Sequence, residues 1–307
     1  MSQLSPSAVF AQISEAVPTS CHENIVVIGS LAAGYHYFHD DGSMGVRTKD
    51  VDCVLEPFQQ AVNAGKDTVR ALLDAGWKRR MIGDHIELGD ESTPEDELPA
   101  VRLYPPDIDP EEEGAWFIEF LTVPENEDSP AKKWTRLPLD EGHFGIPSFR
   151  FLSIAAYEPI NAEGLGIRYA RPEMMALANL LEHPEIKDAP MKGPFAGRTI
   201  KRSNKDLGRV LAIAVLSGLD DFSGWLPQWK KALQACFPAS WKELSSRAGN
   251  GLQELLDSGE DLEEAHHTCA NGLLSSRAVT VEQLGIAGQR LQVDVIEPMG
   301  EWAEGGD

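Results

Sequence analysis

Two carboxylates, Asp50 and Asp52, stand at alternate positions of a short apolar run that continues C-V-L. A β-strand points alternate side chains to one face, so both acids are expected to face the same way. Adjacent carboxylates on a buried strand repel each other and lose hydration. A divalent cation is the usual reason to tolerate this, and Mg²⁺ prefers such hard oxygen ligands. The pair therefore predicts a metal site, and two ordinary acids at a solvent-facing strand edge are the alternative.

A phosphate-binding turn is predicted upstream of the acids. The apolar run from Ile25 to Ile28 has strand character, breaks at Gly29 and Ser30, and is followed by a helical pattern from Leu31 to Phe38. A strand that turns directly into a helix aims backbone N–H groups and a hydroxyl at whatever lies at the helix N-terminus, which suits a phosphate.

Glu119 is the only charge in the strand-like run W-F-I-E-F-L-T-V, residues 116–123. A charge in such a run is rarely buried without a partner. Two interpretations follow from the residues. In the first, Glu119 lies on an edge strand facing water or in a salt bridge. In the second, it is a third acid beside Asp50 and Asp52.

These features together resemble the nucleotidyltransferase superfamily typified by DNA polymerase beta. Its mark is Gly-Ser or Gly-Gly before a helix, an acid-x-acid strand, and a third acid on a neighbouring strand. The run R-T-K-D-V-D, residues 47–52, is most similar to the signature of the AbiEii-type toxin nucleotidyltransferases. The resemblance implies an α+β fold, in which an N-terminal mixed sheet flanked by helices precedes a helical C-terminal domain.

The resemblance also assigns roles to these residues. Asp50 and Asp52 would bind two Mg²⁺ ions, while Glu119 would complete the acceptor-side metal site and act as base on the attacking hydroxyl. Gly29 and Ser30 would hold the triphosphate of an NTP substrate. Nucleotidyl transfer releases pyrophosphate and needs charge neutralisation and in-line positioning more than covalent catalysis.

Further nucleotide contacts are implied at two other motifs. Arg47 would steady the loop or contact a phosphate, and Thr48 matches the family's small hydroxyl residue. In the run R-T-I-K-R-S-N-K-D-L, Lys205 and Asp206 match a later [KR]-D motif, and Lys205 would reach the triphosphate. A capping-box variant between Ser203 and Asp206 is the structural alternative. The preceding helix lacks the lysine that the family usually carries there, and this departure leaves nucleotide contacts from that helix without support.

Other candidate sites are weaker. Asp107 and Asp109 also read D-x-D, but prolines flank them, so a loop is expected. His266, His267 and Cys269 are expected to be ordinary helix residues, because no further ligands stand nearby. The four cysteines lack CxxC spacing and are expected to be reduced thiols.

Composition restricts the partners. The 27 basic and 49 acidic residues give a net charge of −22, which argues against a broad basic face for nucleic acid. No apolar stretch approaches the ~20 residues of a membrane span, and the N-terminus has no signal-peptide pattern. A cytoplasmic protein without a membrane partner is therefore expected.

The segments between the motifs predict two domains, 1–165 and 166–307, the second dominated by helical patterns. Residues 40–46 form a glycine-rich loop able to move over a ligand. Residues 132–160 look irregular apart from a strand-like piece at 150–156, and the tail, 301–307, is expected to be frayed. The other expected elements are helices at 4–17 and 58–75, and strands at 77–82, 85–88 and 99–104.

Three functions remain open at this stage. The leading hypothesis is a toxin-like nucleotidyltransferase, whose acceptor would be the 3′ end of a tRNA and whose activity a cognate antitoxin protein would hold in check. The second is nucleotidylation of a small cationic molecule, as in the aminoglycoside nucleotidyltransferases, which the acidity favours. The third is a non-catalytic nucleotide-binding or protein-interaction module.

Overall fold

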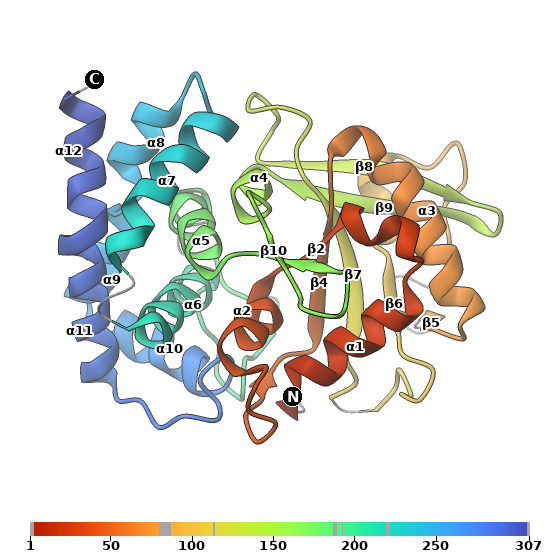
Figure 1. The fold of residues 1–307 in the computed structure, drawn as a ribbon, viewed down its shortest axis with the longest axis horizontal. Helices are drawn as coiled ribbons and strands as arrows, with labels where there is room; N and C mark the ends of the chain where they lie inside the picture. The colour runs from red at the N-terminus through yellow and green to blue at the C-terminus, as the bar shows by residue number, and fades with distance from the viewer. Residues whose placement is uncertain are drawn as a thin grey trace. The chain divides into compact units, whose positions relative to one another are not determined.

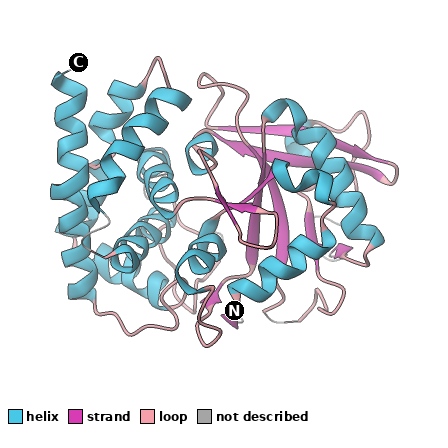
Figure 2. Cartoon of the chain, in the orientation of Figure 1, coloured by secondary structure: helices cyan, strands magenta, loops and turns pink. Residues whose placement is uncertain are grey.

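The computed structural model describes residues 3–79, 87–112, 114–186, 189–191, 193–218 and 222–305. The chain forms two compact units, one of Met1–Ser43 with Arg47–Arg171, the other of Met44–Val46 with Pro172–Asp307. The first unit holds a mixed sheet with helices, and the regular structure from Pro172 onward is helical (Figure 2). The predicted α+β class is therefore confirmed.

The first unit is a mixed α/β arrangement (Figure 1). Its elements are β1 (Gln3–Leu4), α1 (Pro6–Ala16), the 3₁₀ helix η1 (Thr19–Asn24), β2 (Ile25–Val27), α2 (Gly29–Phe38), β3 (Val46–Arg47, whose first residue is assigned to the second unit), β4 (Asp50–Leu55), α3 (Phe58–Asp74), β5 (Lys78–Arg79), the 3₁₀ helix η2 (Glu95–Glu97), β6 (Arg102–Tyr104), β7 (Phe117–Thr122), β8 (Lys132–Leu139), β9 (Gly142–Phe149), α4 (Leu152–Ala155), β10 (Ile160–Asn161) and β11 (Arg168–Tyr169).

Within the described residues, the main sheet runs in the order β10-β11-β2-β4-β7-β6-β5, and β9 joins it by pairing with both β7 and β8. The pairing of β4 with β7 is parallel, whereas β2 with β4 and β6 with β7 are antiparallel. Strands β4 and β7 therefore lie inside the sheet, and the predicted strands that carry the three acids are neighbours.

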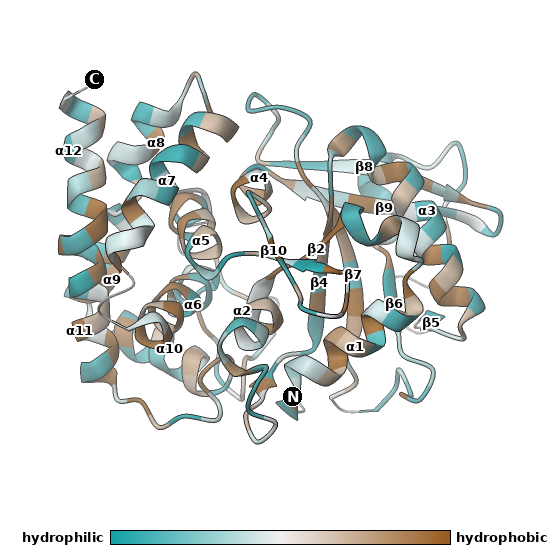
Figure 3. Ribbon diagram, viewed as in Figure 1, coloured by the Kyte–Doolittle hydropathy of each residue, from teal (hydrophilic) through white to brown (hydrophobic). Residues whose placement is uncertain are grey.

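Helix α3 covers one face of this sheet. Its buried residues recur at helical spacing, including Ala61, Gly65 and Leu72, and Figure 3 shows hydrophobic and hydrophilic residues mixed along the same helix. A Cβ atom added at Gly65 would lie 3.0 Å from Cδ1 of Leu55 at the end of β4. Because Leu55 points to the opposite face from Asp50 and Asp52, α3 packs on the face away from the acids.

The segment predicted to be irregular, 132–160, is in fact ordered. Strands β8 and β9 form an antiparallel hairpin over 132–149, joined by a two-residue turn. The strand-like piece expected at 150–156 contains the short helix α4 instead. Both predictions were therefore wrong, and the prolines and glycines of this segment explain why.

The prolines of the hairpin occupy positions that need no N–H group. Pro138 lies opposite His143, and Pro147 lies opposite Trp134. Hydrogen-bonded and non-hydrogen-bonded pairs alternate along an antiparallel ladder, so these two pairs, four residues apart, are of the same type. His143 exchanges backbone hydrogen bonds of 3.0 and 2.8 Å with Gly89 outside the hairpin, so these pairs are the non-hydrogen-bonded ones. Proline at such a position removes no hydrogen bond from the hairpin.

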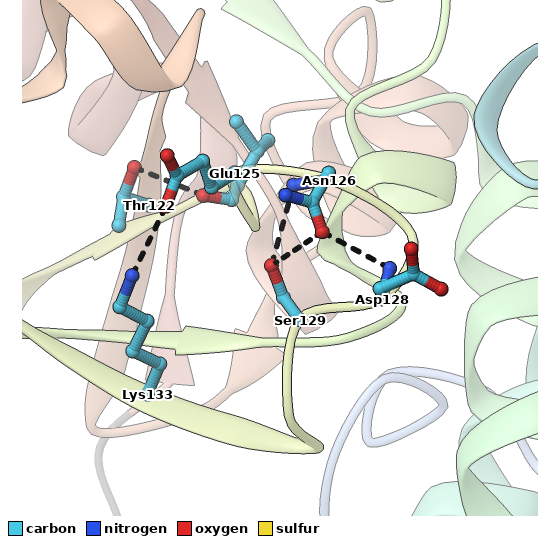
Figure 4. A network of polar contacts seen from close by, with 7 residues as sticks. Thr122, Glu125, Asn126, Asp128, Ser129 and Lys133 are labelled. Carbon is cyan, nitrogen blue, oxygen red and sulfur yellow. Dashed lines mark hydrogen bonds and ion pairs between the residues drawn. The ribbon is translucent and has the colours of Figure 1, made fainter.

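The loop between β7 and β8 is closed by its own polar side chains (Figure 4). Lys133 Nζ lies 3.1 Å from Oε2 of Glu125, and Oδ1 of Asn126 accepts a 3.1 Å hydrogen bond from the N–H of Asp128. The N–H of Asn126 donates to the hydroxyl of Ser129 at 3.2 Å. This local network closes the exposed, acidic part of the loop on the way to the hairpin.

The second unit is built from helices, with a π-helical turn η3 (Gln292–Ile296) between the last two. Its α-helices are α5 (Pro172–Ile186), α6 (Arg202–Ser217), α7 (Phe222–Cys236), α8 (Trp241–Arg247), α9 (Asn250–Asp257), α10 (Gly259–Ala270), α11 (Val281–Leu291) and α12 (Glu297–Gly305).

Aromatic side chains connect these helices. The indole N–H of Trp229, on α7, donates to the carbonyl of Glu173 on α5 at 2.8 Å, and Trp229 is fully buried. Trp302 stacks on Trp241 with ring centroids 4.2 Å apart. Trp302 belongs to α12, which continues to Gly305, so the expectation of a frayed tail was wrong for residues 301–305.

The boundary between the two units lies after residue 165 in the sequence. Strand β11 pairs with β2 through Arg168 and Tyr169, so the sheet uses residues beyond the predicted boundary and the first unit continues to Arg171. In addition, Met44–Val46 belongs to the second unit, where the N–H of Gly45 donates to the hydroxyl of Ser276 at 3.0 Å and that hydroxyl donates to Gly45 O at 2.7 Å. The polypeptide therefore passes between the units three times.

No helix within the described ranges is long and apolar enough to span a bilayer. The strand predicted at 99–104 appears as the shorter β6, and the strand predicted at 77–82 appears over residues 78–79 as β5. Residues 80–82 of that prediction, and residues 85 and 86 of the strand expected at 85–88, lie outside the described residues.

Helices α6 and α10 approach closely at Gly208, and this contact gives a stability test. A Cβ atom at Gly208 would lie 2.9 Å from the carbonyl oxygen of Ala265, a backbone atom that cannot move cheaply. We expect Gly208→Ala to destabilise the protein by about 1–3 kcal/mol through overpacking, measured by thermal unfolding with circular dichroism. The matched control is Gly224→Ala on α7, where a Cβ atom would meet no described atom within 4 Å. That change should be neutral or stabilising by up to about 1 kcal/mol, and equal losses in both variants would contradict the close packing.

Candidate functional site

The predicted acids lie at half-buried positions near the starts of two neighbouring strands. Strands β4 and β7 share one burial pattern, in which the first and third residues are half-buried and the others buried. Asp50 and Asp52 occupy these positions in β4, and Phe117 and Glu119 occupy them in β7. The alternate side chains of β4, such as those of Val51 and Cys53, are buried on the face that α3 covers. We call the side of the sheet that carries the three acids the acid face.

A row of charges crosses three strands of the acid face. Asp52 lies opposite Glu119 in the parallel pair, and Glu119 lies opposite Arg102 of β6 in the antiparallel pair. The guanidinium Nε and Nη2 of Arg102 donate to the two carboxylate oxygens of Glu119, each at 3.3 Å. Glu119 thus makes the salt bridge that the sequence left as one alternative. The edge-strand alternative was wrong, because β7 lies between β4 and β6.

The predicted phosphate turn is hydrogen-bonded to the acid strand. The N–H of Ile28 donates to the backbone carbonyl of Asp52 at 2.9 Å, and α2 begins at the next residue. Gly29 has a φ of +78°, and a Cβ atom there would lie 3.1 Å from Oδ2 of Asp52. Ile28, at the N-cap position, gives α2 no side-chain cap. The first turn of α2, with Ser30, therefore lies beside a carboxylate that metal chemistry would use.

Thr48 supports the first acid. Its hydroxyl donates to Oδ1 of Asp50 at 2.8 Å and lies 3.1 Å from the carbonyl oxygen of the same residue, and Thr48 is buried. Such a bond fixes the orientation of a carboxylate. Arg47, one residue earlier, is exposed, and its predicted phosphate contact stays a prediction.

The donor chemistry of the acid face fits a hard divalent cation, although the cluster is not preformed. Asp50 and Asp52 offer oxygen ligands from one strand to one side, and the glycine turn leaves room beside Asp52. Within the described ranges, however, no three His, Cys, Asp or Glu side chains gather at metal-binding distances. Both oxygens of the third carboxylate, that of Glu119, are engaged by Arg102.

Lys205 and Asp206 belong to α6 of the second unit. Lys205 is half-buried, and Asp206 is buried with Oδ2 4.0 Å from Nε of Arg202. The capping-box interpretation was wrong, since α6 begins at Arg202 and Ser203 lies inside the helix. The roles of Lys205 and Asp206 with nucleotide stay predictions.

The N-terminus of α6 is held by acids of α10 instead. The N–H of Lys201 donates to Oε2 of Glu264 at 3.1 Å, and the Nδ2 group of Asn204 donates to Glu264 and Asp261 at 2.8 Å each. Burial raises the pKa of Asp261, but hydrogen bonds from Lys201, Asn204 and Ser258 outweigh it, so the net pKa lies below the ordinary value. Within the basic run, Lys201 and Asn204 therefore have a structural role.

The weaker candidates make ordinary contacts. The Nε2 atoms of His266 and His267 bond to the carbonyls of Val279 and Phe195 at 2.6 and 3.1 Å, and Sγ of Cys269 donates to the carbonyl of Gly208 at 2.9 Å. Asp107 and Asp109 lie in turns, as predicted. All four cysteines are free.

Arg102 is the one site residue that the sequence did not single out. It lies in the strand-like run 99–104, and nothing in that run marks a functional residue. The available signal is that Arg102, a charge in one short strand, can pair with Glu119, the lone charge of another. Using this signal requires knowing that β6 and β7 are neighbours.

The contact of Gly29 with Asp52 gives a second test. Alanine at φ +78° costs about 1–2 kcal/mol, and its Cβ would also press on the carboxylate. Gly164→Ala is the matched control, because Gly164 has a φ of +73° and open space around the added Cβ. We expect a larger loss of unfolding free energy in urea for Gly29→Ala than for Gly164→Ala, and equal losses would argue against the close approach.

Comparison of the chain with models of protein families, with curated proteins and with solved structures finds no match.

Proposed function

We propose that this protein is a Mg²⁺-dependent nucleotidyltransferase that moves a nucleoside monophosphate from an NTP to an acceptor hydroxyl. The observation that carries the proposal is the convergence of two separate motifs. The Gly29 turn lies beside Asp52, and Asp50 projects from the same strand to the same side. A phosphate-binding helix start beside same-facing carboxylates is what metal-assisted phosphoryl chemistry requires.

Each residue of the acid face has a role in this proposal. Asp50 and Asp52 would hold the metal, with Thr48 orienting the first of them. When bound, Mg²⁺ supplies charge neutralisation for the triphosphate and the leaving pyrophosphate. Glu119, once free of Arg102, would accept the proton of the attacking hydroxyl.

The first turn of α2 would hold the triphosphate. Its N–H groups and the Ser30 hydroxyl lie at the positive end of the helix dipole, beside Asp52. The bonding of Ile28 to Asp52 ties the position of this turn to the acid strand, so nucleotide and acids would keep a fixed geometry. Fixed geometry is the main protein contribution to phosphoryl transfer.

The acceptor is proposed in two forms. The resemblance of residues 47–52 to the toxin nucleotidyltransferases favours the 3′ end of a tRNA, in which case an antitoxin protein would be the partner. The net charge of −22 favours a small cationic acceptor. Growth arrest on expression would support the first acceptor, and protection from an aminoglycoside would support the second.

A non-catalytic nucleotide-binding or interaction module is the alternative of a different class. The pairing of Glu119 with Arg102 favours it, because a permanently paired Glu119 could serve neither as ligand nor as base. Such a module would bind no NTP in a Mg²⁺-dependent way, or would bind it without transferring label.

The test is label transfer from each labelled NTP, with Mg²⁺, to total RNA and to cationic small molecules. We expect Asp52→Asn to lower the rate by more than about 100-fold, since even outer partners of metal ligands are worth 10- to 100-fold. The control is Asp107→Asn, which changes an acid of the same spacing in a turn and should leave the rate unchanged. Transfer that survives Asp52→Asn, or is absent from the wild type with every NTP and acceptor, would refute the proposal.

A further inference from the structure

The Arg102–Glu119 pair is a long and partly exposed contact. Both hydrogen bonds measure 3.3 Å, longer than the 2.7–2.9 Å usual for a charge-assisted bond. The Glu119 side chain is 15% exposed, whereas that of Arg102 is 43% exposed. The guanidinium also lies 5.4 Å from the ring centroid of Phe117, a second favourable contact on the acid face that does not depend on Glu119.

The pair reduces the repulsion between carboxylates on the acid face. Asp52 and Glu119 lie opposite each other on strands whose backbones are about 4.8 Å apart. Like charges so close destabilise each other unless a cation lies nearby. Arg102 supplies that cation from the third strand, and a divalent ion between the two carboxylates would supply it equally well.

We propose that Arg102 is a resident counter-ion for Glu119 that a divalent cation displaces when it binds to the acid face. This inference rests on the proposed function, because it concerns the same metal site. Metal and guanidinium compete for one carboxylate, so Arg102 sets the concentration at which the site fills. Glu119 becomes a metal ligand only after the exchange, and Arg102 is a positioning residue that acts through Glu119.

The test measures Mn²⁺ binding to the full-length protein, with free Mn²⁺ followed by electron paramagnetic resonance and no nucleotide or acceptor present. If the guanidinium competes with the metal, Arg102→Gln should tighten Mn²⁺ binding by about two- to fivefold, the fold-change equivalent of a partly exposed ion pair. Arg102→Lys keeps the charge without the two-pronged contact and should give an intermediate affinity. Arg70→Gln removes an exposed pair with Asp140 elsewhere and should change nothing.

Glu119→Gln separates competition from simple charge removal. In the Glu119→Gln background, Arg102→Gln should have little effect on Mn²⁺ affinity, because the contested carboxylate is gone. Weaker binding by Arg102→Gln, or an equal gain in both backgrounds, would overturn the inference while leaving the metal site in place. Wild-type protein that binds no Mn²⁺, with thermal unfolding showing it folded, would overturn the inference and the proposed function together.

Discussion

Repulsion between carboxylates on neighbouring strands is the constraint on which the acid face depends. Three acids project to one side of β4 and β7, and the parallel register sets Asp52 directly beside Glu119. Each carboxylate would lose hydration and gain a like-charged neighbour on folding. The fold meets this cost with polar partners from adjacent segments. The hydroxyl of Thr48 donates to Asp50, and the guanidinium of Arg102 pairs with Glu119.

The apolar side chains that alternate with the acids in each strand determine which way the acids face. Val51, between the two acids of β4, and Cys53, directly after them, are buried. Burial together with the charge of Asp52 raises the pKa of the Cys53 thiol. A one-residue slip of register would bury the carboxylates beneath α3 and expose these apolar side chains. The hydrophobic contacts on one face therefore position the chemistry on the other.

The sequence was sufficient wherever a local pattern had one physical solution. Strand alternation predicted that Asp50 and Asp52 share a face, and the proline-flanked Asp107 was correctly separated from them. Sequence-based prediction failed where the pairing of distant segments determined the structure. The hairpin over 132–149 tolerates its prolines because of register, and Arg102 acquires meaning only when β6 lies beside β7. Ser203 was interpreted as a cap from its local spacing to Asp206. The residues that bond to the start of α6 are acids of α10, about 60 residues away in the sequence, and no local pattern indicates them.

The loop between the phosphate turn and the acid strand shows the same dependence on distant residues. A glycine-rich stretch at 40–46 reads as free to move, yet Gly45 is bonded at both its N–H and its carbonyl to Ser276 of the second unit. The chain therefore leaves the first unit after Ser43 and returns at Arg47, three residues before Asp50. A segment fixed at its middle can move only in the short arms on either side. The start of the acid strand is thus joined to residues 44–46, a segment that the second unit binds.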